Sequence, residues 1–403
     1  MIPNPDGGNG SCSSTPYGYS GSLAPLNEEI SIHIRGPLKL SRFAAYTPGG
    51  STSKKAKRAA NNHPHGHAHD RLHNKRQADD IVVQTMNGQV VSWVNDYNPG
   101  AAAEATTATV AAPSPYDTPS AYNAPAPSSE SSTSSSGSNS SDTSTDSNSQ
   151  SEGGVINPGG SDSWGRHAFY DGDSSEGLVF LNHKGGSGSG VYDYSFGNSL
   201  SYAGSDGVAC AKEPTKLAKG TTIPGNGEIV IMSDDECDGD DCGYVRDDSV
   251  AYHGFDGDDK AFFFEFQMPD DGQDTDDLYT AVNMPVIWTL NAQIPRTLQY
   301  GQADCSCWES GCGEFDIFEV LAPGETRMKS AMHGNRQGAM EDYYERPIDT
   351  LVKGAMIMTN NEIHVKLLST DFDFPTTMSK SDLTSILESK TTNPSATFNQ
   401  YTS

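Results

Sequence analysis

The chain has 403 residues, 34% of them hydrophobic, and a formal net charge of −27 at pH 7. Phosphate binding draws on clustered Lys and Arg, so this acidic balance argues against a nucleic-acid partner and suits a protein that acts on a neutral polymer. No apolar run approaches the roughly 20 residues that a membrane-spanning helix needs. We expect one large domain with additional poorly packed segments and no membrane span, and we expect the protein to be a monomer.

The cysteine content and the glycosylation signals indicate an oxidising compartment. The chain contains seven cysteines in a Gly-rich background, and sequons stand at Asn9 and Asn139. The first residues show neither the basic region nor the apolar core of a signal peptide, so we expect a secreted protein whose start is truncated. Cys12 stands far from the other six cysteines, and the odd count predicts that its partner lies in the missing part.

The first part of the chain, residues 1–50, is predicted to form a small Gly-rich β module. It contains Ile30-Ser31-Ile32-His33-Ile34, an alternation of apolar and polar residues that is typical of a strand. An apolar stretch follows up to Tyr46, which allows one or two strands. Such a module is too short to bury a core by itself.

The second part, residues 51–158, is predicted to be a disordered linker. It starts with a basic, His-rich tract whose dibasic pairs, Lys57-Arg58 and Lys75-Arg76, suit a processing protease. The histidines between 63 and 73 admit a metal site, but a solvated charged tract is the favoured interpretation. A short strand-like piece spans residues 89–94. The Ala/Pro/Ser/Thr-rich remainder has few large apolar residues to offset chain entropy and is typical of an O-glycosylated stalk.

The third part, residues 159–403, is predicted to be an all-β domain. Short apolar segments alternate with Gly, Asp and Pro turns, and the only helical periodicity is at 380–389. This pattern predicts an antiparallel β-sandwich of the jelly-roll type. The predicted strands include 178–180, 228–232, 260–268, 286–290, 328–333, 352–358 and 363–368.

One predicted strand, Gly313 to Leu321, places three acids among apolar residues. In a strand, side chains alternate faces, so Glu314 and Asp316 share one face and Glu319 falls on the other. A β-bulge at Ile317 or Phe318 would return Glu319 to the face of the other two acids. We therefore predict a bulged strand that presents a row of three carboxyl groups.

Such a row suits glycoside hydrolysis, which needs one carboxylate at the anomeric carbon and one carboxylic acid at the leaving oxygen. Like charges on a partly desolvated surface raise one pKa above the others and keep the acid protonated. Taken alone, the pattern fits a solvated acidic strand face equally well. The neighbouring segments favour the catalytic interpretation.

Four side chains are candidates for sugar binding or site support. Trp288, in an apolar strand, is more often a core residue, but aromatic faces also stack on sugars, and Asn291 near the strand end could bind hydroxyl groups. Trp308 lies just before the acids in the sequence and is a further candidate for contact with the sugar. Residues 322–325 predict a turn, which sets His333 roughly opposite Glu314, where it could orient the nucleophilic carboxylate.

Six cysteines are disulfide candidates, and we expect them to pin the loop that leads into the acid strand. Zinc is disfavoured because no paired C-x-x-C pattern occurs, and six cysteines allow 15 pairings that the sequence does not distinguish. The acidic run 234–241 lacks the closing Glu of an EF-hand, so calcium is also disfavoured and no metal is predicted. The candidates are Cys210, Cys237, Cys242, Cys305, Cys307 and Cys312.

With these residues in view, the chain resembles glycoside hydrolase family 16. The six-residue spacing from Glu314 to Glu319, with Pro285-Val286-Ile287-Trp288 before it and His333-Gly334 after it, is similar to the laminarinase branch. More closely, residues 25–38 and the Cys-rich run 305–316 resemble the fungal cell-wall proteins called target of SBF, a family of predicted glucan endo-1,3-β-glucosidases. The resemblance covers roughly residues 20–50 and 160–370.

The resemblance implies an open cleft on a jelly roll and a retaining double displacement. By motif position it implies that Glu314 is the nucleophile, Glu319 the acid/base and Asp316 the residue that tunes protonation. Trp288 would line the sugar subsites and His333 would support the site. The predicted function is a secreted or wall-associated endo-1,3-β-glucanase that acts on β-1,3-glucan without a cofactor. The alternatives are a glucan transglycosylase on the same scaffold and a non-catalytic glucan-binding wall protein.

Overall fold

The structure is a computed structural model of the whole chain, and part of it can be described. The predicted linker, the dibasic pairs and the two sequons lie outside the described residues, apart from the backbone of two paired strands, β5 (Ile81–Met86) and β6 (Gln89–Val94). The residues described in full are 23–49, 162–193, 196–239, 241–275, 281–302, 305–308, 311–333, 338–389, 394–398 and a few between 4 and 21.

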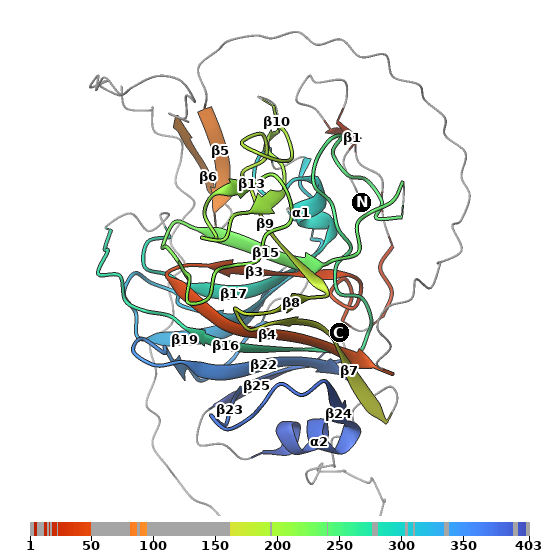
Figure 1. Cartoon of the computed structure of the whole chain (residues 1–403), viewed down its shortest axis with the longest axis vertical. Helices are drawn as coiled ribbons and strands as arrows, with labels where there is room; N and C mark the ends of the chain where they lie inside the picture. The colour runs from red at the N-terminus through yellow and green to blue at the C-terminus, as the bar shows by residue number, and fades with distance from the viewer. Residues whose placement is uncertain are drawn as a thin grey trace, which may run out of the picture. The chain divides into compact units, whose positions relative to one another are not determined.

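Two antiparallel sheets face each other, which confirms the predicted β-sandwich (Figure 1). The first has the order β13 (Cys210–Ala211), β12 (Ser201–Ala203), β9 (Leu178–Asn182), β15 (Glu228–Ser233), β3 (Ile30–Arg35), β17 (Val286–Asn291), β18 (Glu314–Glu319), β19 (Arg327–His333) and β20 (Gly338–Ala339), with β21 (Tyr344–Glu345) also paired to β19. The second has the order β24 (Thr377–Ser379), β7 (Ser163–Tyr170), β4 (Leu38–Pro48), β16 (Lys260–Gln267), β22 (Val352–Thr359), β23 (Glu362–Leu368) and β25 (Ser395–Asn399), with β14 (Thr222–Ile223) on β4 and β8 (Ser175–Glu176) on β7. Two further pairs are β1 (Asn4–Pro5) with β2 (Cys12–Ser13) and β10 (Tyr192–Asp193) with β11 (Gly197–Asn198).

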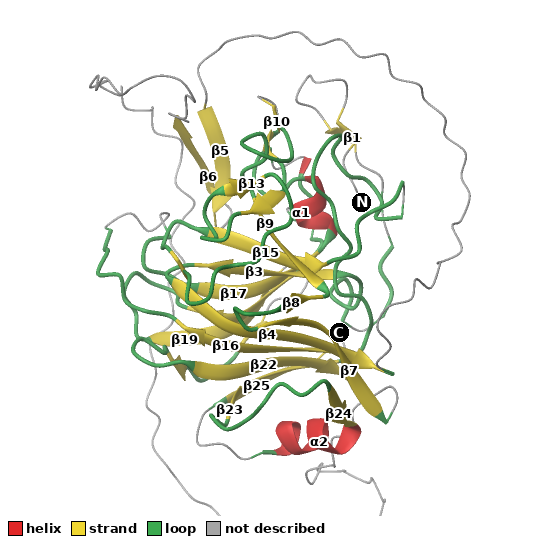
Figure 2. Ribbon diagram, in the orientation of Figure 1, coloured by secondary structure: helices red, strands yellow, loops and turns green. Residues whose placement is uncertain are grey.

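The core forms where alternating apolar side chains of the two sheets meet. In β16, Phe262, Phe264 and Phe266 join the core between the sheets, whereas Phe263 faces outward. The outer face of the second sheet is covered by α2 (Lys380–Glu388), the helix expected at 380–389, as Figure 2 shows. The second helix, α1 (Gln293–Thr297), is a single short segment after β17. Within the described residues, no helix is long and apolar enough to cross a membrane.

The N-terminal strands are built into the sandwich and do not form a module of their own. Strand β3 lies between β15 and β17 in the first sheet, and β4 lies between β7 and β16 in the second. The structure differs here from the expectation of a separate small module within residues 1–50. Two strands cannot cover their apolar faces alone, and here Ile32, Ile34 and Phe43 are buried in the shared core.

The bulge predicted in the acid strand is present. Phe318 pairs with Ile287 and Asp316 pairs with Trp288, so Ile317 is the extra residue on β18. The carbonyl of Ile317 accepts a 2.6 Å hydrogen bond from the buried Ser330 hydroxyl, which satisfies a backbone group that the ladder leaves free. Phe315, Ile317, Phe318 and Val320 all pack in the core. Packing of these side chains in the core therefore keeps the three acids on the opposite face of the sheet.

Gly354 tests how tightly the core holds this bulge. A Cβ atom at Gly354 would lie 2.7 Å from two ring atoms of Phe318, which is fully buried, so the ring would have to shift. We expect Gly354→Ala to lower the free energy of unfolding by about 1–3 kcal/mol, the usual cost of overpacking. Chemical denaturation measures this, and Phe318→Leu in the same chain should restore part of the loss. A Gly354→Ala protein as stable as the parent would show that the bulge is loosely held.

Candidate functional site

The three acids of β18 lie on the outer face of the first sheet, away from the core. Their cross-strand partners on β19 are His333 for Glu314, Ala331 for Asp316 and Lys329 for Glu319. The predicted pairing of His333 with Glu314 is therefore confirmed. Asp316 is almost completely buried, and Glu314 and Glu319 are partly buried. The strand thus presents a desolvated row of carboxyl groups with a histidine beside it.

Asp316 is the centre of the hydrogen bonding in this row. The Nε2 atom of His333 lies 2.8 Å from Oδ2 of Asp316, although the backbone of His333 pairs with Glu314. Glu319 is also close to Asp316, because one carboxylate oxygen of each and a ring nitrogen of His333 all lie within 4.8 Å of one another. Two carboxyl groups so close together in little water favour a state in which one of them carries a proton.

Glu314 has a different environment. The indole N–H of Trp308 donates a 2.8 Å hydrogen bond to its Oε2 atom. An indole N–H can only donate, so it is best matched by an ionised carboxylate. The structure thus places Trp308 as a partner of an acid, whereas the sequence had suggested that it contacts sugar.

Burial raises the pKa of all three carboxyl groups. For Glu319 the value rises to about 8, mainly through burial and also through the charge of Asp316. Burial and the charge of Asp316 also raise the pKa of Glu314, and the Trp308 hydrogen bond opposes them. Burial raises the pKa of Asp316. Crowded carboxyl groups in little water cannot all ionise together, so the row can supply both a proton donor and a carboxylate.

Arg35 is the charged residue of this site that sequence reasoning missed. It ends β3, pairs with Val286 of β17, and Val286 pairs in turn with Glu319. The positive charge of Arg35 opposes the burial effect at Asp316 and at Glu319. A signal was present in the sequence, because the alternation from Ile30 to Ile34 places Ser31, His33 and Arg35 on one face.

Two of the predicted sugar-binding residues are buried. Trp288 is on the same sheet face as the acids but is only 3% exposed, packed in a cluster with Leu290 and against Trp308. Asn291 is 1% exposed. Its side chain donates to the carbonyl of Pro25 and accepts from the N–H of Gln293, so it fixes the backbone at the end of β17. Asn291 is therefore occupied by structural contacts, and Trp288 offers little open surface for stacking.

A buried polar cluster continues from the site toward β15. The carboxylate of Glu228 accepts hydrogen bonds from the hydroxyl of Tyr300 and the amide of Gln299, and His33 Nδ1 lies 3.3 Å from it. Burial opposes ionisation of Glu228, but these partners outweigh burial and lower its pKa. The Tyr300 ring packs edge-on to Trp308, with ring centroids 5.8 Å apart. The cluster thus supports the loop that carries Trp308.

The cysteines pin this loop through two disulfide bonds, one of which includes Cys12. Cys307 bonds to Cys312 across Trp308, and Cys12 bonds to Cys305. The expected partner of Cys12 in a missing part is therefore wrong, because the two cysteines meet in the fold despite 293 residues between them. Cys237 bonds to Cys242, and Cys210, a disulfide candidate, is unpaired. With seven cysteines, at least one must stay unpaired within the chain.

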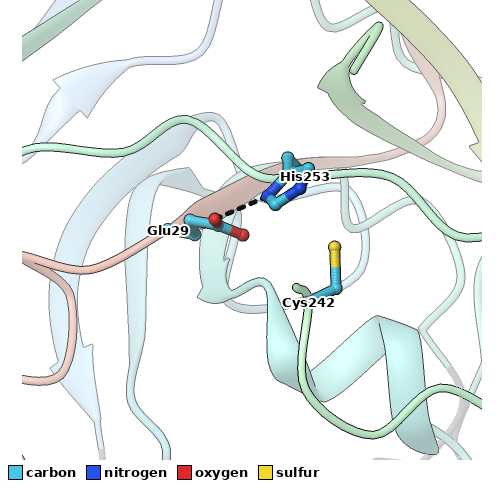
Figure 3. A group of neighbouring side chains, drawn as sticks. All are labelled: Glu29, Cys242 and His253. Atoms are coloured by element: carbon cyan, nitrogen blue, oxygen red, sulfur yellow. Dashed lines mark hydrogen bonds and ion pairs between the residues drawn. The ribbon is translucent and has the colours of Figure 1, made fainter. Parts of the chain in front are cut away.

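A second group of possible metal ligands lies outside the acid row: Glu29, Cys242 and His253 (Figure 3). Its sulfur belongs to a disulfide and is not a free thiolate. His253 Nδ1 lies 2.8 Å from Glu29, whose other carboxylate oxygen accepts from Arg296. These contacts make an ion-pair network that ties the start of β3 to α1. The disulfide interpretation of Cys242 is therefore confirmed.

The fold and the site define an antiparallel β-sandwich protein with a cluster of carboxyl groups on one sheet face. The family model described as "Cell wall protein YJL171C/Tos1, C-terminal" matches residues 162–386, and the corresponding N-terminal model matches residues 2–48. The chain belongs to this family of cell wall proteins. No solved structure matches it.

Several relatives have names that describe an activity. A protein of Arthroderma benhamiae named "Probable circularly permuted 1,3-beta-glucanase" is 40% identical over 385 residues, which cover 93% of this chain and 83% of that protein. TOS1 of Saccharomyces cerevisiae, with the same description, is 40% identical over 390 residues, covering 94% and 84%. PGA52 of Candida albicans, also so described, is 31% identical over 387 residues, covering 92% and 72%.

The Trp308 hydrogen bond should be measurable at Glu314. Trp308→Phe removes the N–H donor that favours the ionised carboxylate, so we expect the pKa of Glu314 to rise. Carbon-13 NMR titration of labelled glutamate carboxyl groups measures this. Trp288→Phe is the matched control, because its buried N–H has no hydrogen-bond partner among the described residues. An unchanged Glu314 titration in Trp308→Phe would contradict the role of the indole.

The Glu29–His253 pair should make stability depend on pH. The hydrogen bond to Glu29 raises the pKa of His253 to about 9. The stability that His253 contributes is therefore full below pH 6.5 and is lost as pH rises through 9. Burial opposes ionisation of Glu29, but His253 and Arg296 lower its pKa to about 2, so its contribution is full above pH 4.5 and is lost toward pH 2.

We therefore expect Glu29→Gln to lower Tm most between pH 4.5 and 6.5, and less at pH 3 and pH 9.5. Thermal unfolding at pH 3, 5.5 and 9.5 measures the difference. Asp173→Asn, which breaks an exposed pair with Lys219, should change Tm little at each pH. A Glu29→Gln deficit that is equal at all three pH values would contradict the pairing.

Proposed function

We propose that the protein is a retaining 1,3-β-glucanase of the fungal cell wall. The observation that carries the proposal is the desolvated row of carboxyl groups on one face of β18, in which Trp308 donates a hydrogen bond to Glu314 and Asp316 lies beside Glu319. Retaining glycosidases need two such groups, a nucleophile and an acid. The substrate class is supported by the names of relatives that are 40% identical along most of their length.

In the first half-reaction, Glu314 attacks the anomeric carbon of a glucosyl unit while Glu319 gives its proton to the glycosidic oxygen. The C–O bond breaks, the shortened chain leaves with a free hydroxyl group, and the glycosyl unit stays bound to Glu314. In the second half-reaction, Glu319 takes a proton from water, and the resulting hydroxide displaces Glu314. The protonation states at the end are those at the start.

Asp316 and His333 serve the acid in this mechanism. Asp316 lies beside Glu319, and its negative charge favours the protonated form of that acid. His333 contacts Asp316 at 2.8 Å and fixes its orientation, whereas the sequence had suggested that it orients the nucleophile. The proposal includes secretion to the wall, cleavage within β-1,3-glucan chains and kinship with glycoside hydrolase family 16.

The decisive variant is Glu319→Gln, which cannot give or take a proton. We expect reducing-end release from linear β-1,3-glucan by the oxidised protein to fall by roughly 100- to 10,000-fold. Glu341→Gln, at an exposed position outside the row, should keep the parent activity. Mass analysis of the products accompanies the assay. Products longer than the substrate would assign a transglycosylase, and a folded parent that binds glucan but releases no ends would overturn the enzyme assignment.

A further inference from the structure

Arg35 lies in the same row of the sheet as the acid of the proposed reaction. It pairs across the ladder with Val286, and Val286 pairs with Glu319, so the three residues follow one line across β3, β17 and β18. Side chains in such a line point to one face of a sheet. Val286, the residue between them in this line, is uncharged.

The position of Arg35 is defined by contacts that do not involve the acids. Its Nε atom donates a 3.2 Å hydrogen bond to the carbonyl of Met284. Its guanidinium carbon lies 5.9 Å from the centroid of the Trp288 ring, within the range of a cation–π contact. Because Trp288 is itself buried, the side chain of Arg35 is supported on both sides. The charge is therefore held beside the row before any substrate binds.

Three other charged or titratable groups face Asp316 and Glu319, and one of them, Lys329, is also a cation, whose Nζ atom lies over the ring of Tyr343. Glu314 on the same strand is negative when it is ready to attack. On β19, His333 is 51% exposed and Lys329 is opposite Glu319 in register, and β17 contributes only Val286 and Trp288. Arg35 is always protonated, and its charge lowers the pKa of both members of the pair.

We propose that Arg35 is a positioning residue that stabilises the fully ionised Asp316–Glu319 pair and so allows Glu319 to release and recover its proton in each turnover. The inference depends on the proposed function. When Glu319 protonates the glycosidic oxygen, the pair changes from one negative charge to two in a site with little water. A fixed positive charge at the end of β3 offsets that change without any rearrangement.

The test compares Arg35→Met with Arg35→Lys. In Arg35→Met we expect kcat on β-1,3-glucan to fall by roughly 10- to 100-fold with KM within about twofold, and the alkaline limb of the pH profile to move up by roughly one unit or more. The direction follows because loss of the cation raises the pKa of Glu319. Arg35→Lys should restore much of kcat and return the alkaline limb most of the way to its position in the parent. Arg42→Met, which removes a charge from the second sheet, should change neither.

A measurement without substrate separates this inference from the proposed function. Carbon-13 NMR of labelled carboxyl groups, with Glu319 assigned by its loss in Glu319→Gln, should show its titration at higher pH in Arg35→Met than in the parent. If Glu319→Gln kept its activity while this shift was present, the proposed function would fail and the electrostatic coupling would stand. An unshifted titration would overturn the inference, as would a raised KM with unchanged kcat, which would make Arg35 a sugar-binding residue.

Discussion

The site depends on one extra residue in a strand. Without the bulge at Ile317, strand periodicity would send Glu319 toward the core, where an acid has no partner and Val320 would face outward. The bulge is stable because its two faces are satisfied in different ways. Phe318 packs against Phe266 and Tyr344 in the core, with ring centroids 5.2 Å away from each, and Ser330 binds the free carbonyl of Ile317. The carboxyl row therefore rests on the packing of the sandwich behind it.

A row of acids with little water is unstable unless other groups control its protons. Each acid has a polar or charged group from another part of the chain nearby: Trp308 at Glu314, His333 at Asp316, and Arg35 two strands away in the row of Glu319. The disulfides reinforce this convergence. Cys307–Cys312 closes the loop that carries Trp308, and Cys12–Cys305 ties that loop to the N-terminal segment. Burial supplies the raised pKa values, and these partners decide which acid holds the proton.

The sequence predicted those features of the site that depend on local periodicity. The strand positions, the bulge and the pairing of His333 with Glu314 follow from counting residues along one strand and around one turn. The placement of β3 between β15 and β17 does not follow from such counting. It joins residues about 200 to 250 positions apart, and no short-range pattern encodes such pairing. The same reason explains the missed Cys12–Cys305 bond, whose partners are 293 residues apart.

The burial of individual side chains was the second property that the local sequence pattern could not predict. Trp288 stands at a position that would suit an open sugar-binding surface if the outer face of β17 were bare. That face is instead covered by the Cys-rich loop, by Tyr19 and by α1, which bury Trp288. Asn291, an odd number of residues further along the strand, is held by backbone contacts to Pro25 and Gln293. The covering also desolvates the neighbouring strand, and desolvation is the largest cause of the raised pKa values at Glu314, Asp316 and Glu319. The loop that covers Trp288 thus belongs to the environment that makes the acids chemically useful, and an arginine fixed from β3 becomes necessary because water cannot screen them.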